Sequence, residues 1–388
     1  MIQKTSRLPS LTGMRFIAAV LVFVTHVAAG KLFSDASLSD FLNAYLSRTG
    51  YLGVSFFFVL SGFILTWTAR PDDTAARFWR RRFVKIYPNH FVTWLAGLLL
   101  MVWAGAAVTT GDTVPSLFLV QSWSPDFGVL MGTNGPSWSL ACELLFYLSF
   151  PLLLPLLRKI PAARLWIAAA VVAAAVWLVP LISQLGPDAP LSPFQPVSWW
   201  KYWFTYFMPA SRLFEFVMGI VMALIVQKGR WIGMKRTTAF LLLGVAYALQ
   251  VALPDSWGLV APVVLPLGLA VAAGAVADTT GQRSVFASKT MVWLGEVSFA
   301  FYLVHILVFD YGPIGLATHP DAEHARATPV SIGLIVLTFG LSLLFGWLLY
   351  TFVERPMMRF SRPKKKPPAP VAVTVVATPD PLAGGKQQ

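Results

Sequence analysis

The stretch TGMRFIAAVLVFVTH, Thr12–His26, joins an apolar centre to an arginine near one end and a histidine at the other. The centre, Phe16–Thr25, is apolar enough for lipid, and apolar runs of about 20 residues, the length that a helix needs to cross the hydrocarbon core, recur along the chain. Because lipid offers backbone groups no hydrogen-bond partner, such runs form helices. The sequence therefore predicts an all-α polytopic membrane helix bundle.

Composition supports this fold class. Of 388 residues, 56% are hydrophobic and 12% are charged, whereas about a quarter are charged in soluble domains. The net charge of +13 does not indicate a nucleic-acid binder, because the basic residues are scattered between apolar runs and do not form one basic face. The one cysteine, Cys142, predicts a buried inert thiol, with no disulfide framework and no thiolate metal site.

Hydropathy predicts about ten transmembrane helices, and the distribution of charge predicts their direction. If the chain begins inside, the 30 Lys and Arg residues divide into 24 inside, 4 outside and 2 within spans, which is the positive-inside pattern and predicts that both termini are cytoplasmic. The predicted spans cover approximately residues 11–30, 51–69, 86–108, 137–157, 165–185, 209–227, 237–253, 259–277, 291–309 and 329–352.

The ends of the chain need separate interpretation. Lys4 and Arg7 before an apolar stretch resemble a signal peptide, but Arg15 inside that stretch and the many later spans favour retention as the first transmembrane helix. We expect residues 1–361 to form one transmembrane domain. Residues 362–388 are rich in Pro with a short Lys run and predict a disordered, basic cytoplasmic tail. Two outside loops, 109–136 and 310–328, are long enough to help shape a binding mouth.

Arg15 and His26 share one helix face. They are eleven positions apart, and eleven steps of about 100° exceed three full turns by only about 20°, while the rise separates them by about 16 Å. Titratable groups at such depths face the bundle interior or a wet cavity. The alternative is that Arg15 reaches the inner headgroups and His26 lies at the outer interface.

The ninth span carries a polar stripe. Gly295, Ser298, Tyr302 and His305 fall at i, i+3, i+7 and i+10, and His305 lies in the outer half as His26 does. The stripe favours a functional interior face, although hydrogen bonds between helices would require the same residues.

Two further spans carry carboxylates. Glu143 lies roughly two turns from the outer end of the fourth span, and a carboxylate close to an imidazole can orient the ring and stabilise its protonated form. We therefore expect His26, His305 and Glu143 to converge in the outer half of the membrane. In the sixth span, Arg212 and Glu215 at i, i+3 predict a buried ion pair, and a structural role is favoured over a catalytic one.

The segment ARPDDTAARFWRRRFVKIYP after the second span is predicted to be a basic cytoplasmic loop. Such runs either set the topology or bind an anionic ligand, and guanidinium groups suit phosphate. Together with Arg15, the loop indicates a phosphate-bearing donor that arrives from the cytoplasm. Its basic residues are Arg70, Arg77, Arg80, Arg81, Arg82 and Lys85.

These segments resemble the acyltransferase 3 family of bacterial integral-membrane O-acyltransferases. The first matching segment has Arg15, ten residues and then His26, and the second contains the Ser-Gly-Phe motif that begins at Ser61. The family's Arg-x-x-Arg before Tyr-Pro is replaced by Arg82-Phe83-Val84-Lys85, whereas Arg77 and Arg80 have the spacing five residues earlier. The segments, in order, are SLTGMRFIAAVLVFVTH, GVSFFFVLSGFIL, RRRFVKIYP, SWSLACELLFYLSFP, SRLFEFVMG, LGEVSFAFYLVH and ERP.

The resemblance implies transfer of an acyl group, often acetyl, from acyl-CoA as a co-substrate to a hydroxyl of a surface glycan, a lipid-linked sugar or a metabolite such as a macrolide. It implies that His26 is the catalytic histidine, that Arg15 handles the donor and that Glu143 is a functional carboxylate, in the bacterial cytoplasmic membrane. No permanently bound cofactor is expected. Two alternatives remain: a proton-coupled exporter, which uses the same residue types, and a non-catalytic scaffold.

Overall fold

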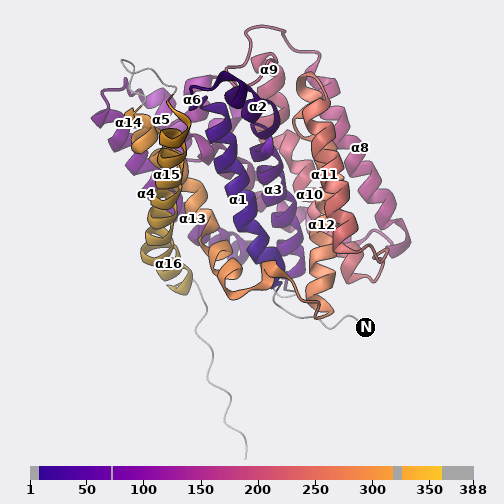
Figure 1. Ribbon diagram of the computed structural model, residues 1–388. Coiled ribbons are helices and arrows are strands. Elements are labelled where there is room, and N and C mark those ends of the chain that lie inside the picture. The colour runs from indigo at the N-terminus through magenta and orange to yellow at the C-terminus, as the bar shows by residue number, and fades with distance from the viewer. Residues whose placement is uncertain (1–7, 71–72, 318–325, 361–388) are drawn as a thin grey trace, which may run out of the picture.

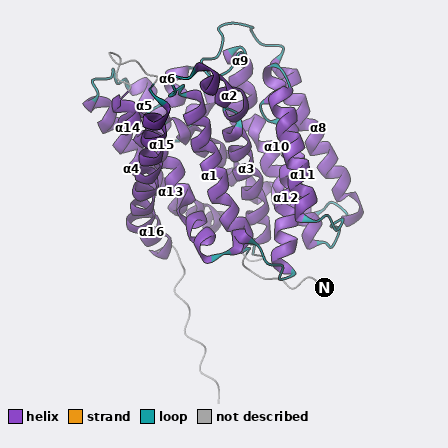
Figure 2. Ribbon diagram, in the orientation of Figure 1, coloured by secondary structure: helices purple, strands orange, loops and turns teal. Residues whose placement is uncertain are grey.

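The computed structural model describes residues 8–70, 73–317 and 326–360, and in these ranges the chain is a bundle of helices without a named strand (Figures 1 and 2). The predicted all-α polytopic bundle is confirmed. Nine of the described helical segments are long and apolar enough to cross a membrane, and a shorter apolar helix, α11, brings the number to the ten predicted. The ten are α1 (Pro9–Ala29), α3 (Thr49–Trp67), α4 (Ala75–Trp103), α7 (Trp138–Arg158), α8 (Leu165–Ser183), α10 (Pro209–Gln227), α11 (Arg236–Ala252), α12 (Ala261–Thr279), α13 (Lys289–Tyr311) and α15 (Thr328–Leu349).

The core of the bundle lies around α3, α10 and α12. In the apolar segments that contain these helices, 78%, 78% and 83% of the residues are buried, against 28% for α4 and 22% for α15. Figure 1 shows α15 and α4 on one flank of the bundle, α8 on the other, and α1 and α3 between them. α1 packs against both α3 and α13, so the helices that carry Arg15 and His305 are direct neighbours.

Glycine allows the closest helix crossings. A Cβ on Gly62 of α3 would overlap the carbonyl oxygen of Phe216 in α10, and a Cβ on Gly295 of α13 would overlap the carbonyl oxygen of Thr12 in α1. Small residues permit this approach of backbones, which is how membrane helices gain packing energy in lipid. The second crossing fixes α13 against the N-terminal half of α1, close to Arg15 in the sequence.

The two ends of the bundle carry different charges. The described chain begins, and α16 (Arg355–Phe360) ends, at the same end of the bundle, whereas α2 (Ala36–Leu46) and α9 (Trp199–Tyr202) lie at the opposite end (Figure 1). The four cations predicted to be outside belong to segments at that opposite end, which agrees with the predicted segregation of charge. That this end faces the outside of the cell stays a prediction. The four are Lys31, Arg48, Lys201 and Arg326.

The basic segment is not a loop over most of its length, because it is helical from Ala75 onward. α4 begins at Ala75 and not at Ile86, and the hydroxyl of Thr74 caps it by accepting a hydrogen bond from the Arg77 amide at 3.3 Å. Hydropathy does not detect this start, because the first three turns carry arginines and are not apolar. The charged residues therefore have fixed directions around a helix and do not lie on a loop.

The two loops predicted to be outside also contain helices that hydropathy does not detect, because they are too short to span a membrane. In the predicted loop 109–136 these are α5 (Thr110–Leu117) and α6 (Phe127–Met131), with 3-10 turns at Gln121–Trp123 and Gly135–Ser137. The predicted loop 310–328 begins with the last residues of α13 and contains α14 (Pro313–Ala317). Its residues 318–325 lie outside the described ranges, as does the predicted tail 362–388.

Candidate functional site

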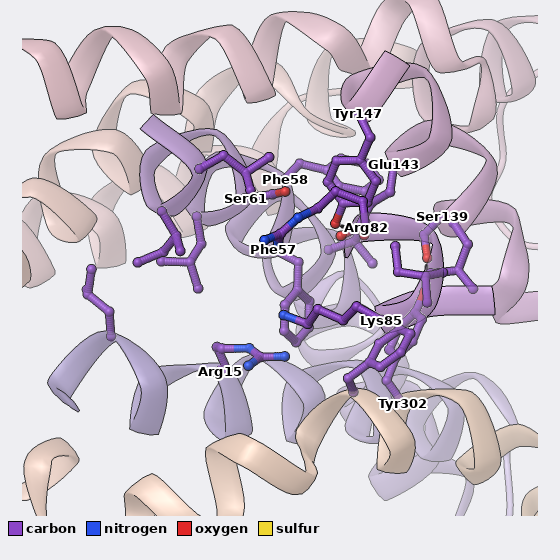
Figure 3. A pocket seen from close by; sticks show the side chains of 18 of the residues that line it. Arg15, Phe57, Phe58, Ser61, Arg82, Lys85, Ser139, Glu143, Tyr147 and Tyr302 are labelled. Atoms are coloured by element: carbon purple, nitrogen blue, oxygen red, sulfur yellow. Dashed lines mark hydrogen bonds between the residues drawn. The ribbon is translucent and has the colours of Figure 1, made fainter. Parts of the chain in front are cut away.

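A cavity of about 170 Å³ lies among α1, α3, α4, α7 and α13 (Figure 3). Its apolar wall consists mainly of α3 side chains, including Phe57 and Phe58. Its charged lining consists of Arg15 from α1, Arg82 and Lys85 from α4, and Glu143 from α7; its hydroxyl groups come from Thr12, Ser61, Ser139, Tyr147 and Tyr302.

The charges in this cavity are not balanced. Three cations face one carboxylate, and Glu143 Oε2 accepts a hydrogen bond from the Tyr147 hydroxyl at 2.6 Å. Within the described part of the chain, Arg15 and Lys85 form no ion pair, and the Nε of Arg82 is buried without a hydrogen-bond partner. Because unpaired charge is costly away from water, the cavity is suited to an anionic ligand.

The direction of the α4 side chains separates the predicted basic residues into two groups. Arg82 and Lys85, three positions apart on one face, point into the cavity (Figure 3), whereas Arg77 and Arg80 are exposed. Arg81 points away and forms a bidentate ion pair with Asp73, and its guanidinium holds the pKa of Asp73 below the ordinary value. Of the two pairs with this spacing, Arg77 with Arg80 and Arg82 with Lys85, only the second therefore lines the cavity.

Two partners of the cavity residues were missed by sequence reasoning. Tyr147 is four positions after Glu143, and the i, i+4 neighbourhood on a helix was the available signal. Glu354 lies in a π-helical turn, Tyr350–Glu354, where it is buried and accepts a hydrogen bond from Asn89 Nδ2 at 2.8 Å. Its charge acts on Lys85, and only its place in the ERP motif pointed to it.

The two predicted histidines lie together but outside this cavity. The ring centroids of His26 and His305 are 5.2 Å apart, so the two histidines are neighbours, while their location in the outer half of the membrane stays a prediction. Neither lines the cavity. Tyr302 connects the cavity with the histidine pair. It is one of the residues that line the cavity, and its carbonyl oxygen lies 2.6 Å from His305 Nδ1.

Glu143 does not join the histidines, so the predicted convergence of all three is wrong. In the described ranges no hydrogen bond or ion pair links Glu143 to His26 or His305, and the cations that act on Glu143 are Lys85, Arg15 and Arg82. The physical reason is the depth at which α7 starts. The Tyr302 hydroxyl donates to the Pro136 carbonyl at 3.1 Å, just before α7 begins, and Glu143, about two turns further along α7, lies in the cavity with Arg15, Arg82 and Lys85.

The remaining predicted polar residues have structural surroundings. Arg212 and Glu215 are fully buried and paired at 2.9 Å from Nε to Oε1, and the guanidinium also lies over the rings of Phe58 and Tyr206 at 5.0 and 4.9 Å. Neither lines the cavity, which favours the structural interpretation. Ser298 donates a hydrogen bond to the Gly295 carbonyl of its own helix at 2.8 Å.

The polar stripe of α13 faces the bundle interior as predicted, since Gly295, Ser298, Tyr302 and His305 are all buried. Cys142 is buried as well, with Sγ 3.5 Å from the Phe207 carbonyl oxygen.

Comparison with known proteins places this geometry in a family. The model of a family described as an acyltransferase domain matches residues 8–351, which is nearly the whole described bundle. Acyltransferase MdmB of Streptomyces mycarofaciens is 43% identical over 359 residues, which cover 91% of this chain and 92% of that protein.

More distant relatives match over only part of their own length or of this chain. The peptidoglycan O-acetyltransferase OatA of Listeria monocytogenes is 23% identical and covers 90% of this chain, but this chain spans only 56% of that protein. Nodulation protein 10 of Rhizobium leguminosarum is 32% identical over 28% of this chain and 34% of that protein. The resemblance that the sequence motifs indicated is confirmed.

Proposed function

This chain belongs to the acyltransferase 3 family and is a multi-pass membrane acyltransferase, and we propose that it moves an acyl group from acyl-CoA to a hydroxyl of a glycan or a secreted metabolite such as a macrolide. The observation that supports acyl-CoA as the donor is the excess of positive charge in the cavity. Coenzyme A carries phosphates, and unpaired cations beside an apolar wall suit a ligand with an anionic end and an uncharged arm.

The donor would be held by the α4 cations and Arg15. Arg82 supplies a guanidinium fork and Lys85 a compact charge, and both face the cavity. The exposed Arg77 and Arg80 lie on earlier turns of the same helix, where they would contact those coenzyme A phosphates that lie outside the cavity. Glu143, fixed by Tyr147, would balance these cations when the cavity is empty.

The reacting end would lie toward His26, about 16 Å from Arg15 along α1. One ring nitrogen of His26 takes the proton of the acceptor hydroxyl, and the oxygen attacks the thioester carbonyl carbon. The carbon–sulfur bond then breaks, and the thiolate leaves with the proton from the imidazolium. The products are the ester and coenzyme A with a free thiol, and no further reactant is required.

Purified protein with labelled acetyl-CoA and a panel of hydroxylated saccharides and metabolites tests this proposal. We expect release of free thiol together with a product heavier by one acetyl group. His26→Ala should lower transfer by about a hundredfold or more, the usual contribution of a general base. Ile17→Ala, at an exposed position on the same helix, is the matched control and should leave the rate unchanged.

Three results would contradict the proposal. A proton-coupled exporter would move the acceptor across a vesicle membrane and leave the thioester intact. A scaffold would tolerate substitution of both Arg15 and His26 without loss of its effect in cells. Full turnover in folded His26→Ala would remove the histidine from its role as base. The bacterial relatives support the cytoplasmic membrane as the location in which to test the full chain.

A further inference from the structure

His305 has one ring nitrogen in use and one without a partner. Its side chain is fully buried, and Nδ1 lies 2.6 Å from the Tyr302 carbonyl oxygen. A carbonyl oxygen can only accept, so Nδ1 carries the hydrogen, and the neutral ring then presents a lone pair at Nε2. That Nε2 is buried and has no hydrogen-bond partner among the described residues.

Three of the rings packed against His305 belong to Phe301, Phe23 and Tyr302, and the centroid of the Tyr302 ring is 5.8 Å away. Phe301 stacks on His305 at 6.0 Å between centroids, with 13° between the planes, and Phe23 meets its edge at 6.5 Å. His26 is the nearest of the ring neighbours, with its centroid 5.2 Å away and its plane tilted by 48°. His26 is half-buried, and among the described residues its ring has no hydrogen bond that would oppose a turn of the ring toward His305.

We propose that His305 is the positioning residue of His26: its Nε2 accepts a hydrogen bond from one ring N–H of His26. This bond selects the tautomer in which the other nitrogen of His26 carries its lone pair toward the acceptor hydroxyl. The spacing of the two rings leaves room for one such bond, which is about 3 Å long between nitrogens. The inference rests on the proposed function, since it requires His26 to act as the base.

Proton transfer strengthens this arrangement. When His26 takes the hydroxyl proton it becomes an imidazolium, and its N–H to His305 becomes a charge-assisted hydrogen bond, which is stronger than a neutral one. His305 keeps its own proton on Nδ1 throughout, and the added proton leaves His26 with the thiolate. His305 thus supplies the orientation that the sequence assigned to Glu143, without placing a negative charge beside His26.

Two substitutions separate positioning from a purely structural role. His305→Asn places an amide N–H near the Nδ1 position, so it can keep the bond to the Tyr302 carbonyl, but it has no acceptor at the Nε2 position. His305→Gln reaches the Nε2 position with its carbonyl oxygen but loses the inner donor. We expect His305→Asn to lower kcat by about tenfold or more with little change in the KM for acyl-CoA, and His305→Gln to retain the larger part of kcat.

The reverse order overturns the inference. If His305→Asn has the kcat of the unchanged protein while His305→Gln is inactive, the Tyr302 bond matters and the Nε2 lone pair does not. An active His26→Ala variant would instead refute the proposed base, whereas an inactive His26→Ala with a fully active His305→Asn removes only the present inference.

A measurement on the unchanged protein covers the case in which neither variant folds. Nitrogen-15 magnetic resonance of histidine-labelled protein in bilayers should show His305 as neutral and protonated at Nδ1. A charged ring, or one protonated at Nε2, contradicts the inference.

Discussion

The buried pair Arg212 and Glu215 tests whether charged residues outside the cavity serve stability and not acyl transfer. Both side chains are fully buried and paired at 2.9 Å, and the guanidinium is also held by the rings of Phe58 and Tyr206. Glu215→Gln keeps the shape of the side chain but leaves the guanidinium without a counter-charge. Removing one partner of a buried pair costs about 3–5 kcal/mol, whereas replacing both by apolar residues of similar volume is often neutral or stabilising.

Unfolding of detergent-solubilised protein, followed by fluorescence on heating, measures this difference. We expect Glu215→Gln to unfold several degrees below the unchanged protein and the double variant Arg212→Met with Glu215→Leu to unfold near it. Acyl transfer per folded molecule should be unchanged in the double variant, because neither residue lines the cavity. A stable Glu215→Gln would contradict the buried-charge argument, and a folded but inactive double variant would show that the pair takes part in the chemistry.

Two further predictions concern α4 and its N-terminal side. Arg82→Ala should raise the KM for acyl-CoA by about tenfold or more, since a hydrogen bond to a charged group contributes about 1.5–3 kcal/mol. Arg80→Ala, at an exposed position, should raise the KM less. Equal effects of the two substitutions would contradict the assignment of Arg82 to the donor site. Because Arg81 lowers the pKa of Asp73 in the folded state, the pair adds stability above the ordinary Asp pKa of about 3.9, and this stability is lost as the pH falls through the lowered value. The gap in unfolding temperature between the unchanged protein and Asp73→Asn should therefore be present at pH 7 and close under acid conditions, and a gap that stays the same at both would refute the pairing.

The sequence was a good guide to what lies within one helix. Arg15 and His26 were placed on one face from helical periodicity alone, and the Arg212–Glu215 pair followed from its i, i+3 spacing. Both are consequences of the helix repeat and need no knowledge of neighbouring helices. The i, i+4 contact between Glu143 and Tyr147 was available from the same rule.

The sequence was a poor guide to contacts between residues of different helices, because these contacts depend on the depth at which each helix begins. Glu143 was placed beside the histidines by counting turns from the predicted outer surface. α7 instead starts inside the bundle, after short helices that hydropathy does not detect, and its first residue, Trp138, is already buried. A shift of one turn, about 5.4 Å, is enough to move a carboxylate from one site to another.

The amino-acid sequence by itself determined the fold class, the long apolar helices and the family, because lipid allows few structures and each span must carry its own apolar run. Tertiary structure alone decided which charged groups meet. It turned Arg82 and Lys85 into the cavity and Arg81 out to Asp73, brought Glu354 from the far end of the chain to Asn89, and set His305 beside His26. The physical reason is that helix periodicity fixes direction within a segment, while the relative rotation and depth of two helices come from packing that no single segment encodes.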